Sequence, residues 1–106
     1  MLVIRLFCAA GMSTSLVVNK MKEAAANRGL EADIAAYPES KMKECLDEGM
    51  DVALLGPQVR YILKKAQAAC SEKGVPVEII PAVQYGRVDG EGILDFALAL
   101  IEKNKK

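Results

Sequence analysis

The 106-residue sequence has no histidine and no tryptophan, and aromatic residues make up only 5% of it. Because histidine is absent, the chain itself supplies neither a phosphohistidine nor an imidazole base, and a reaction that needs either must take it from another protein. The three cysteines, Cys8, Cys45 and Cys70, show no CxxC spacing. This pattern argues against a zinc site and against a disulfide framework, so we expect no metal.

Charge and hydropathy exclude further classes of protein. The 14 Lys and Arg residues balance the 14 Asp and Glu residues, and we therefore expect no nucleic-acid partner. No apolar run approaches the roughly 20 residues that a membrane-spanning helix needs, and the first residues lack the order of a signal peptide. The chain is accordingly expected to be cytoplasmic. A hydrophobic content of 52% at this length predicts a single α/β domain over residues 1–106.

Strand and helix patterns alternate from end to end. Apolar runs predict strands over residues 2–7, 32–37, 51–55 and 77–80. Prolines flank the last of these runs, which indicates an edge strand. Helical patterns follow the strands, over residues of about 13–28, 40–48, 57–73 and 93–101. We expect Ser40 to cap the second helix, residues 85–92 to form a loop, and three glycines to end the first three helices: Gly29, Gly49 and Gly74.

This alternating order predicts a parallel sheet with helices on both faces, which is a three-layer α-β-α fold. We predict four strands in the order 2-1-3-4. The first and third strands are then neighbours, and the direction of winding reverses between them, which is where such sheets bind ligands. Cys8 ends the first strand and Gly56-Pro57-Gln58 follow the third. Both are therefore expected to border one crevice.

The segment after Cys8 has the composition of an anion-binding loop. Its glycine and alanines let backbone N–H groups approach an anion, its hydroxyls are donors, and no acidic residue occurs before Glu23. The N-terminus of the next helix favours the thiolate of Cys8. We therefore predict that Cys8 is a nucleophile that attacks phosphorus. The predicted phosphate-binding residues are Ala9, Ala10, Gly11, Met12, Ser13, Thr14 and Ser15.

Hydrolysis and relay of a phosphoryl group are distinguished by one position. Cysteine phosphatases place an arginine six residues after the nucleophile, where it clamps the phosphate, and Thr14 stands there in this chain. No residue that would activate water is evident, so the loop favours relay. The alternative is a low-molecular-weight cysteine phosphatase-like hydrolase, for which Asp89 is the one candidate acid, although helix capping explains Asp89 more simply. A regulatory module that uses Cys8 as a sensor thiol is a third hypothesis.

Structural roles compete with these functional ones. A free cysteine at the end of a strand is often a small buried residue, and ordinary capping explains the hydroxyls at the start of the helix. Cys45 and Cys70 lie in helical patterns with no glycine-rich loop, so we interpret them as core residues.

The run Cys8-Ala9-Ala10-Gly11-Met12-Ser13-Thr14-Ser15-Leu16 resembles the signature of the IIB component of the bacterial phosphoenolpyruvate-dependent sugar phosphotransferase system, lactose/cellobiose (chitobiose) type. The similarity covers essentially the whole chain. It includes Leu54-Leu55-Gly56-Pro57-Gln58 and Tyr85-Gly86-Arg87-Val88-Asp89-Gly90. The resemblance implies a fold similar to that of low-molecular-weight tyrosine phosphatases, a phosphate loop over residues 9–15, and no metal or dissociable cofactor.

The resemblance also implies a phosphoryl carrier with two protein partners. A phosphohistidine on the IIA protein donates its phosphoryl group to the family's active-site cysteine, which is Cys8 here. The phosphocysteine then phosphorylates a sugar bound to the membrane IIC transporter, on the cytoplasmic side. The chain would thus be a protein-phosphocysteine–sugar phosphotransferase, and its sugar a β-linked disaccharide such as cellobiose or chitobiose.

Five further residues are candidates for the surroundings of the loop. Gln58, Tyr85 and Arg87 are expected to line its rim, where they would bind the phosphate or a partner, or serve only as turn and surface residues. Met12 and Leu16 are candidates for a docking surface. Core packing is the competing interpretation of both, and it is favoured more for Leu16 than for Met12.

Overall fold

The structure, a computed structural model, describes residues 1–8 and 14–104. Within these residues four strands form one parallel sheet in the order β2-β1-β3-β4, which confirms the predicted order. The strands are β1 (Leu2–Cys8), β2 (Ala32–Pro38), β3 (Val52–Leu55) and β4 (Val77–Ile79). The helices are α1 (Thr14–Asn27), α2 (Met42–Glu48), α3 (Leu63–Ser71), α4 (Ala82–Gly86) and α5 (Gly90–Asn104), with 3-10 helices η1 (Glu39–Lys41) and η2 (Pro57–Ile62).

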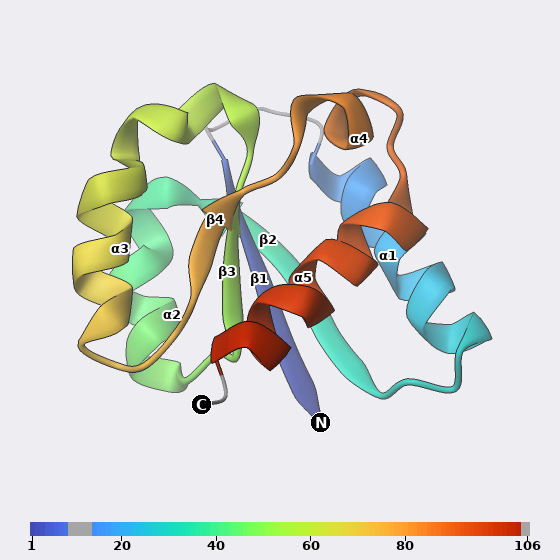
Figure 1. Cartoon of the computed structure of the whole chain (residues 1–106), viewed down its shortest axis with the longest axis horizontal. Helices are drawn as coiled ribbons and strands as arrows, with labels where there is room; N and C mark the ends of the chain where they lie inside the picture. The colour runs from blue at the N-terminus through green and yellow to red at the C-terminus, as the bar shows by residue number, and fades with distance from the viewer. Residues whose placement is uncertain (9–13, 105–106) are drawn as a thin grey trace.

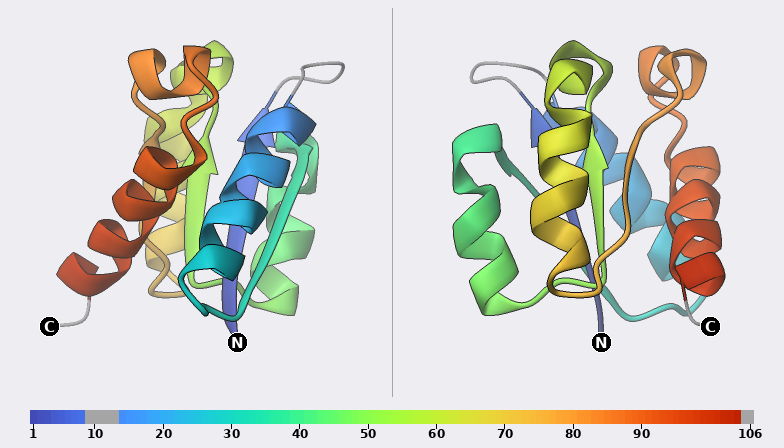
Figure 2. Two further views of the ribbon diagram at one scale, coloured as in Figure 1. Left: turned by 90° about the vertical axis from the view of Figure 1, so that its right-hand side faces the viewer. Right: turned by 60° about the vertical axis from the view of Figure 1, so that its left-hand side comes forward.

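Helices cover both faces of the sheet (Figures 1 and 2). On one face α1 and α5 pack over Ile4 and Leu6 of β1, and on the other face α2 and α3 pack with Phe7. Successive side chains of β1 point to opposite faces, so this central strand contributes to both halves of the core. The predicted three-layer α-β-α architecture is confirmed.

Most of the helix ends lie where the sequence predicted them. Gly29, Gly49 and Gly74 follow α1, α2 and α3 with φ angles of +66°, +101° and +70°. The capping role of Ser40 was wrong, because Ser40 lies inside η1. The extended residue that begins this helical segment is Pro38 (φ −62°, ψ 152°), two residues earlier, and α2 has no side-chain cap.

The predicted loop over residues 85–92 was also wrong in part. Tyr85 and Gly86 belong to α4, a short helix that begins directly after Pro81, and α5 already begins at Gly90. Asp89 explains this early start, because its Oδ1 accepts a hydrogen bond of 3.0 Å from the Gly92 N–H and so caps the first turn of α5.

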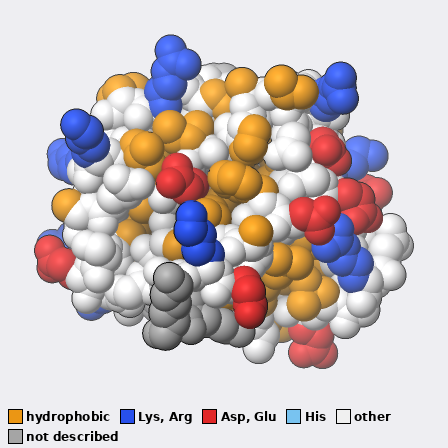
Figure 3. Space-filling model, viewed as in Figure 1, with side chains coloured by type: hydrophobic (Ala, Val, Ile, Leu, Met, Phe, Trp, Pro, Cys, Tyr) orange, Lys and Arg blue, Asp and Glu red, His pale blue; other side chains and the backbone are white. Residues whose placement is uncertain are grey.

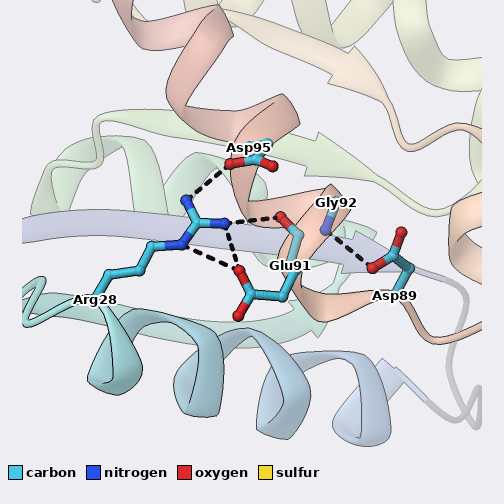
Figure 4. Close-up of polar contacts among 5 residues, drawn as sticks. All are labelled: Arg28, Asp89, Glu91, Gly92 and Asp95. Atoms are coloured by element: carbon cyan, nitrogen blue, oxygen red, sulfur yellow. Dashed lines mark hydrogen bonds and ion pairs between the residues drawn. The ribbon is translucent and has the colours of Figure 1, made fainter.

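Helices α1 and α5 lie close together over the sheet. A methyl group on Gly90 would lie 2.4 Å from the backbone carbon and oxygen of Lys20, so only glycine permits this approach. At the other end of α1, Arg28 donates hydrogen bonds to Glu91 and to Asp95, the latter over 2.7 Å (Figure 4). The packing of α5 thus fixes the position of α1, and α1 begins next to the segment that follows Cys8.

The surface seen in Figure 3 combines hydrophobic side chains in the middle of the face with acidic and basic side chains spread around and across it. This face carries the edge strand β4 between α3 and α5 (Figure 1). Among the described residues, no helix is both long enough and apolar enough to span a bilayer.

Candidate functional site

Cys8 is the last residue of β1, at the carboxyl end of the sheet, and it is buried with 7% of its surface exposed. In the sheet it pairs with Pro38 of β2 on one side. On the other side Gly56, the first residue after β3, donates a backbone hydrogen bond of 2.9 Å to the Phe7 carbonyl oxygen. The ends of the first and third strands therefore meet at Cys8, where the strand order predicts a ligand site.

Gly56 and Gln58 lie directly beside Cys8. A methyl group on Gly56 would lie 3.6 Å from Cβ of Cys8 and 2.7 Å from Oε1 of Gln58. The Gln58 side chain is therefore folded back over Gly56, which also lies against Cys8, although Gln58 as a whole is exposed. Among the described residues its carboxamide has no hydrogen-bond partner. Gln58 and Cys8 thus both border Gly56, and the role of Gln58 at the rim stays a prediction.

Helix α1 begins at Thr14, and its first turn contains no acidic residue. The positive end of its dipole is therefore not neutralised by a carboxylate of its own. Ser15 is exposed in this turn. The predicted phosphate-binding residues Ala9, Ala10, Gly11, Met12 and Ser13 lie outside the described residues, and their role stays a prediction.

Tyr85 and Arg87 come from α4 and the turn after it, at the same end of the sheet (Figure 1). Tyr85 is half-buried and packs against the part of the core beneath α1 and α5. Arg87 is exposed, and within the described residues it forms no ion pair. Arg87 is thus a cation open to solvent, and the rim roles of Tyr85 and Arg87 stay predictions.

Exposed apolar side chains surround this end of the sheet. Leu16 on α1 is 54% exposed, so core packing, the competing interpretation of this docking candidate, was wrong. The next two residues of α1, Val17 and Val18, are buried in the core, so Leu16 lies off the face of the helix that packs on the sheet. Tyr61 on η2 and Val83 on α4 are 73% and 65% exposed. We call Leu16, Tyr61 and Val83 the apolar rim.

Sequence reasoning missed two members of the apolar rim. Tyr61 falls between Arg60 and Ile62, off the apolar face of its helical pattern, and Val83 lies in a segment adjoining the predicted loop. An apolar residue out of phase with its helix is the signal that could have found Tyr61. The Tyr61 hydroxyl also lies 3.3 Å from the Glu39 carboxylate, and the negative charge of Glu39 raises the pKa of the Tyr61 phenol.

The two other cysteines are buried in the core half that contains α2 and α3, as predicted. Burial raises the pKa of the Cys45 thiol and the pKa of the Cys70 thiol, because the apolar surroundings disfavour the thiolate. Neither lies at the end of a strand. Over residues 1–8 and 14–104, no three side chains of the types Cys, Asp and Glu come together as a metal-binding group.

Comparison with known proteins assigns the family. Residues 3–96 match the lactose/cellobiose-specific IIB subunit family of the sugar phosphotransferase system (PTS). The chain belongs to this IIB family. It is 40% identical over 98 residues to the oligo-beta-mannoside-specific EIIB component of Bacillus subtilis (strain 168), with 92% of this chain and 94% of the relative covered.

Two EIIB components of Lactococcus lactis are similar to the same degree. The cellobiose-specific protein of strain IL1403 and the galactose-specific protein of strain MG1363 are each 42% identical over 100 residues. Both alignments cover 87% of this chain and 89% of the relative. The family that the sequence resembled is thus the family to which the chain belongs.

Two solved structures share the fold. The cellobiose-specific IIB component of Borrelia burgdorferi superposes with a TM-score of 0.80 at 36% identity, covering 97% of this chain and 94% of that one. The lactose-specific IIB domain of Streptococcus pneumoniae gives a TM-score of 0.79 at 16% identity, covering 93% and 96%, and at that identity it bears on the fold alone. As a IIB component, the chain is a phosphotransferase of sugar phosphorylation that works with other components of the system and a sugar.

Proposed function

We propose that this IIB chain carries a phosphoryl group on Cys8 between two protein partners, a IIA protein and a membrane IIC transporter. The observation that carries the proposal is the position of Cys8, which ends β1 at the carboxyl edge of the sheet and starts the family's signature sequence. The absence of histidine from the chain supports it as well, since the donor histidine then belongs to the partner.

In the first step the Cys8 thiolate sulfur attacks the phosphorus of the phosphohistidine on IIA. The S–P bond forms, the P–N bond breaks, and the electron pair of that bond returns to the imidazole nitrogen, which takes up a proton. In the second step a hydroxyl oxygen of the sugar attacks the same phosphorus. The O–P bond forms, the S–P bond breaks, the thiolate is released, and the hydroxyl proton passes to a base or to water.

We propose that the backbone N–H groups and hydroxyls of residues 9–15 hold the phosphoryl group between these steps. The acid-free first turn of α1 supports this role, because the helix N-terminus then favours the charge of about −1.5 to −2 that phosphorylation adds. Thr14 supplies no guanidinium at the position where phosphatases have arginine. The charge of a hydrolytic transition state is stabilised less in such a site, so phosphocysteine is retained for transfer.

The partners and the location follow from the same proposal. Transfer to a sugar held by IIC requires the chain to work on the cytoplasmic side of the membrane. We propose a β-linked disaccharide such as cellobiose or chitobiose as the sugar, which the names of the oligo-beta-mannoside-specific and cellobiose-specific relatives support and that of the galactose-specific relative does not. The apolar rim, formed by Leu16, Tyr61 and Val83, lies on the helical elements that follow β1, β3 and β4 and is suited to bury against a partner.

The proposal is tested by incubating the chain with phosphoenolpyruvate, the general phosphotransferase proteins and a IIA protein. Mass spectrometry of the intact and digested chain then locates the phosphate. We expect one phosphate, on Cys8, lost in Cys8→Ala and retained in the matched variants Cys45→Ala and Cys70→Ala. Sustained hydrolysis of an aryl phosphate that depends on Cys8 would instead assign the chain to the phosphatases.

A further inference from the structure

Gln58 and Cys8 both lie against Gly56. A methyl group at Gly56 would touch both, at 2.7 Å from the Gln58 Oε1 and 3.6 Å from the Cys8 Cβ. Its third neighbour would be the Phe7 carbonyl oxygen at 3.7 Å. The absence of a side chain at position 56 therefore leaves a space that the Gln58 carboxamide oxygen occupies and that Cys8 borders.

The chemistry of this carboxamide suits a phosphoryl group. It has two N–H donors, and no hydrogen bond occupies them within residues 1–8 and 14–104. A half-turn about its terminal bond exchanges the oxygen and the nitrogen, so the N–H groups reach the position that Oε1 now has. Its exposure lets it make this rotation at no loss of packing. A dianion on the neighbouring sulfur provides the acceptor.

On the basis of the proposed function, we propose that Gln58 donates a hydrogen bond from Nε2 to a phosphoryl oxygen on Cys8. A neutral donor stabilises the phosphocysteine without the charge neutralisation that an arginine would supply, so the group stays transferable. Gln58 would thus supply part of the phosphate binding that an arginine at the position of Thr14 supplies in phosphatases. No bond is made or broken by Gln58 itself, and the residue positions the phosphoryl group for attack.

Gly56 provides a second, independent way to disturb this contact. Its backbone is extended (φ −64°, ψ 149°), a conformation that alanine adopts without strain. The added methyl group would meet the Cys8 Cβ and the Phe7 oxygen at ordinary contact distances and only the Gln58 oxygen too closely. Gly56→Ala is therefore expected to displace the flexible Gln58 side chain and leave the backbone in place.

The first measurement is an NMR spectrum of the side-chain amides with and without phosphorylation by IIA. We expect the Nε2 protons of Gln58 to shift on phosphorylation, while those of Gln67, exposed on α3, stay in place. A phosphorylated Cys8 with unmoved Gln58 signals would overturn this inference and leave the proposed function intact. A chain that takes up no phosphate on Cys8 would overturn both.

The second measurement is the equilibrium of phosphoryl transfer between IIA and this chain. Losing one hydrogen bond to a charged acceptor is expected to shift it toward phospho-IIA by about tenfold. Gln58→Met keeps the length of the side chain and removes the donors, and Gly56→Ala displaces them. Both should show the shift, and the double variant should show no more than either alone. An unchanged equilibrium in both single variants, or a matching shift in the control Gln67→Met, contradicts the role of Gln58.

Discussion

Gly56 lies against Cys8 because its N–H group is hydrogen-bonded to the Phe7 carbonyl oxygen, one residue before the cysteine. The sheet itself thus fixes the distance between the two residues, since β1 and β3 are neighbours in it. A side chain at position 56 can move away from Cys8 only if the end of a central strand moves with it. The size of residue 56 therefore controls the free space beside the thiol.

Gly56→Val is expected to slow the phosphorylation of Cys8 by about tenfold or more. Its first side-chain atom would already lie 3.6 Å from the Cys8 Cβ, so the further methyl groups occupy the space that an incoming phosphoryl group needs. The initial rate with phospho-IIA measures this effect. Urea unfolding serves as the control, and a normal rate in a folded Gly56→Val protein would show that this side of Cys8 is not used.

Gly90→Ala is expected to destabilise the fold by about 2 kcal/mol. The new methyl group would lie 2.4 Å from the backbone of Lys20, and neither helix backbone can yield as a flexible side chain would. Gly86→Ala is the matched control, because a methyl group there has no described atom within 4 Å. Urea unfolding of both variants tests the prediction, and equal stability would mean that α1 and α5 can separate freely.

How far the sequence determined this structure is seen best at the sheet and at the segment before α5. Apolar runs and glycine stops predicted the strands and three helix ends, because each reflects a local preference of the backbone. The turn from Tyr85 to Gly92 could not be predicted in the same way. Its short helix depends on Pro81 before it, and the start of α5 depends on the bond from the Gly92 N–H to Asp89.

In the candidate site, too, some features could be predicted from the sequence and others could not. The position of Cys8 at the carboxyl end of a strand follows from the apolar run before it, whereas the strand order that brings Gly56 beside it was an inference that periodicity does not fix. The exposure of Leu16 could not be predicted, because an apolar residue in a helix is buried only if the facing element covers it. Val17 and Val18 are covered, whereas the side of α1 that carries Leu16 is not. The position of the Gln58 side chain against Gly56 is likewise not specified by any pattern in the sequence.

The thiols of Cys45 and Cys70 are expected to react slowly with iodoacetamide. Burial raises the pKa of both, so at pH 8 the fraction of thiolate is smaller than in an unfolded chain, and access is restricted too. Rates measured by mass spectrometry on the Cys8→Ala protein should rise as the pH increases past the ordinary thiol range. The same protein in urea is the reference, and equal rates in the two states would contradict the burial of these residues.

The ion pair of Arg5 and Asp33 is expected to make stability depend on pH on the acid side. Arg5 Nη2 lies 3.0 Å from Asp33 Oδ2, and this hydrogen bond lowers the pKa of Asp33 below its ordinary value of 3.8. Because the pKa of Asp33 is lower in the folded state than in the unfolded state, the stabilisation is fully present at pH values above the unfolded-state pKa. It is lost as the pH falls through the folded-state pKa. Asp33→Asn should therefore reduce the midpoint of thermal unfolding at pH 6 and have less effect near pH 2.

The control for this measurement is Glu102→Gln. Glu102 is an exposed carboxylate on α5 with no ion pair among the described residues. Its neutralisation should leave the midpoint nearly unchanged at both pH values. A deficit of Asp33→Asn that is equally large at pH 2 and pH 6 would mean that the contribution of Asp33 does not depend on its charge.

The apolar rim gives a prediction about docking. Leu16→Ser and Val83→Ser are expected to raise the KM for phospho-IIA about fivefold each, because exposed apolar side chains of this size contribute about 1 kcal/mol when an interface buries them. The kcat should stay near its original value, since neither residue touches the phosphorus. Because both side chains are more than half exposed, the free energy of unfolding should change little. Ala99→Ser, at an exposed residue of α5, is the control. A KM that neither rim variant changes would place the docking surface elsewhere.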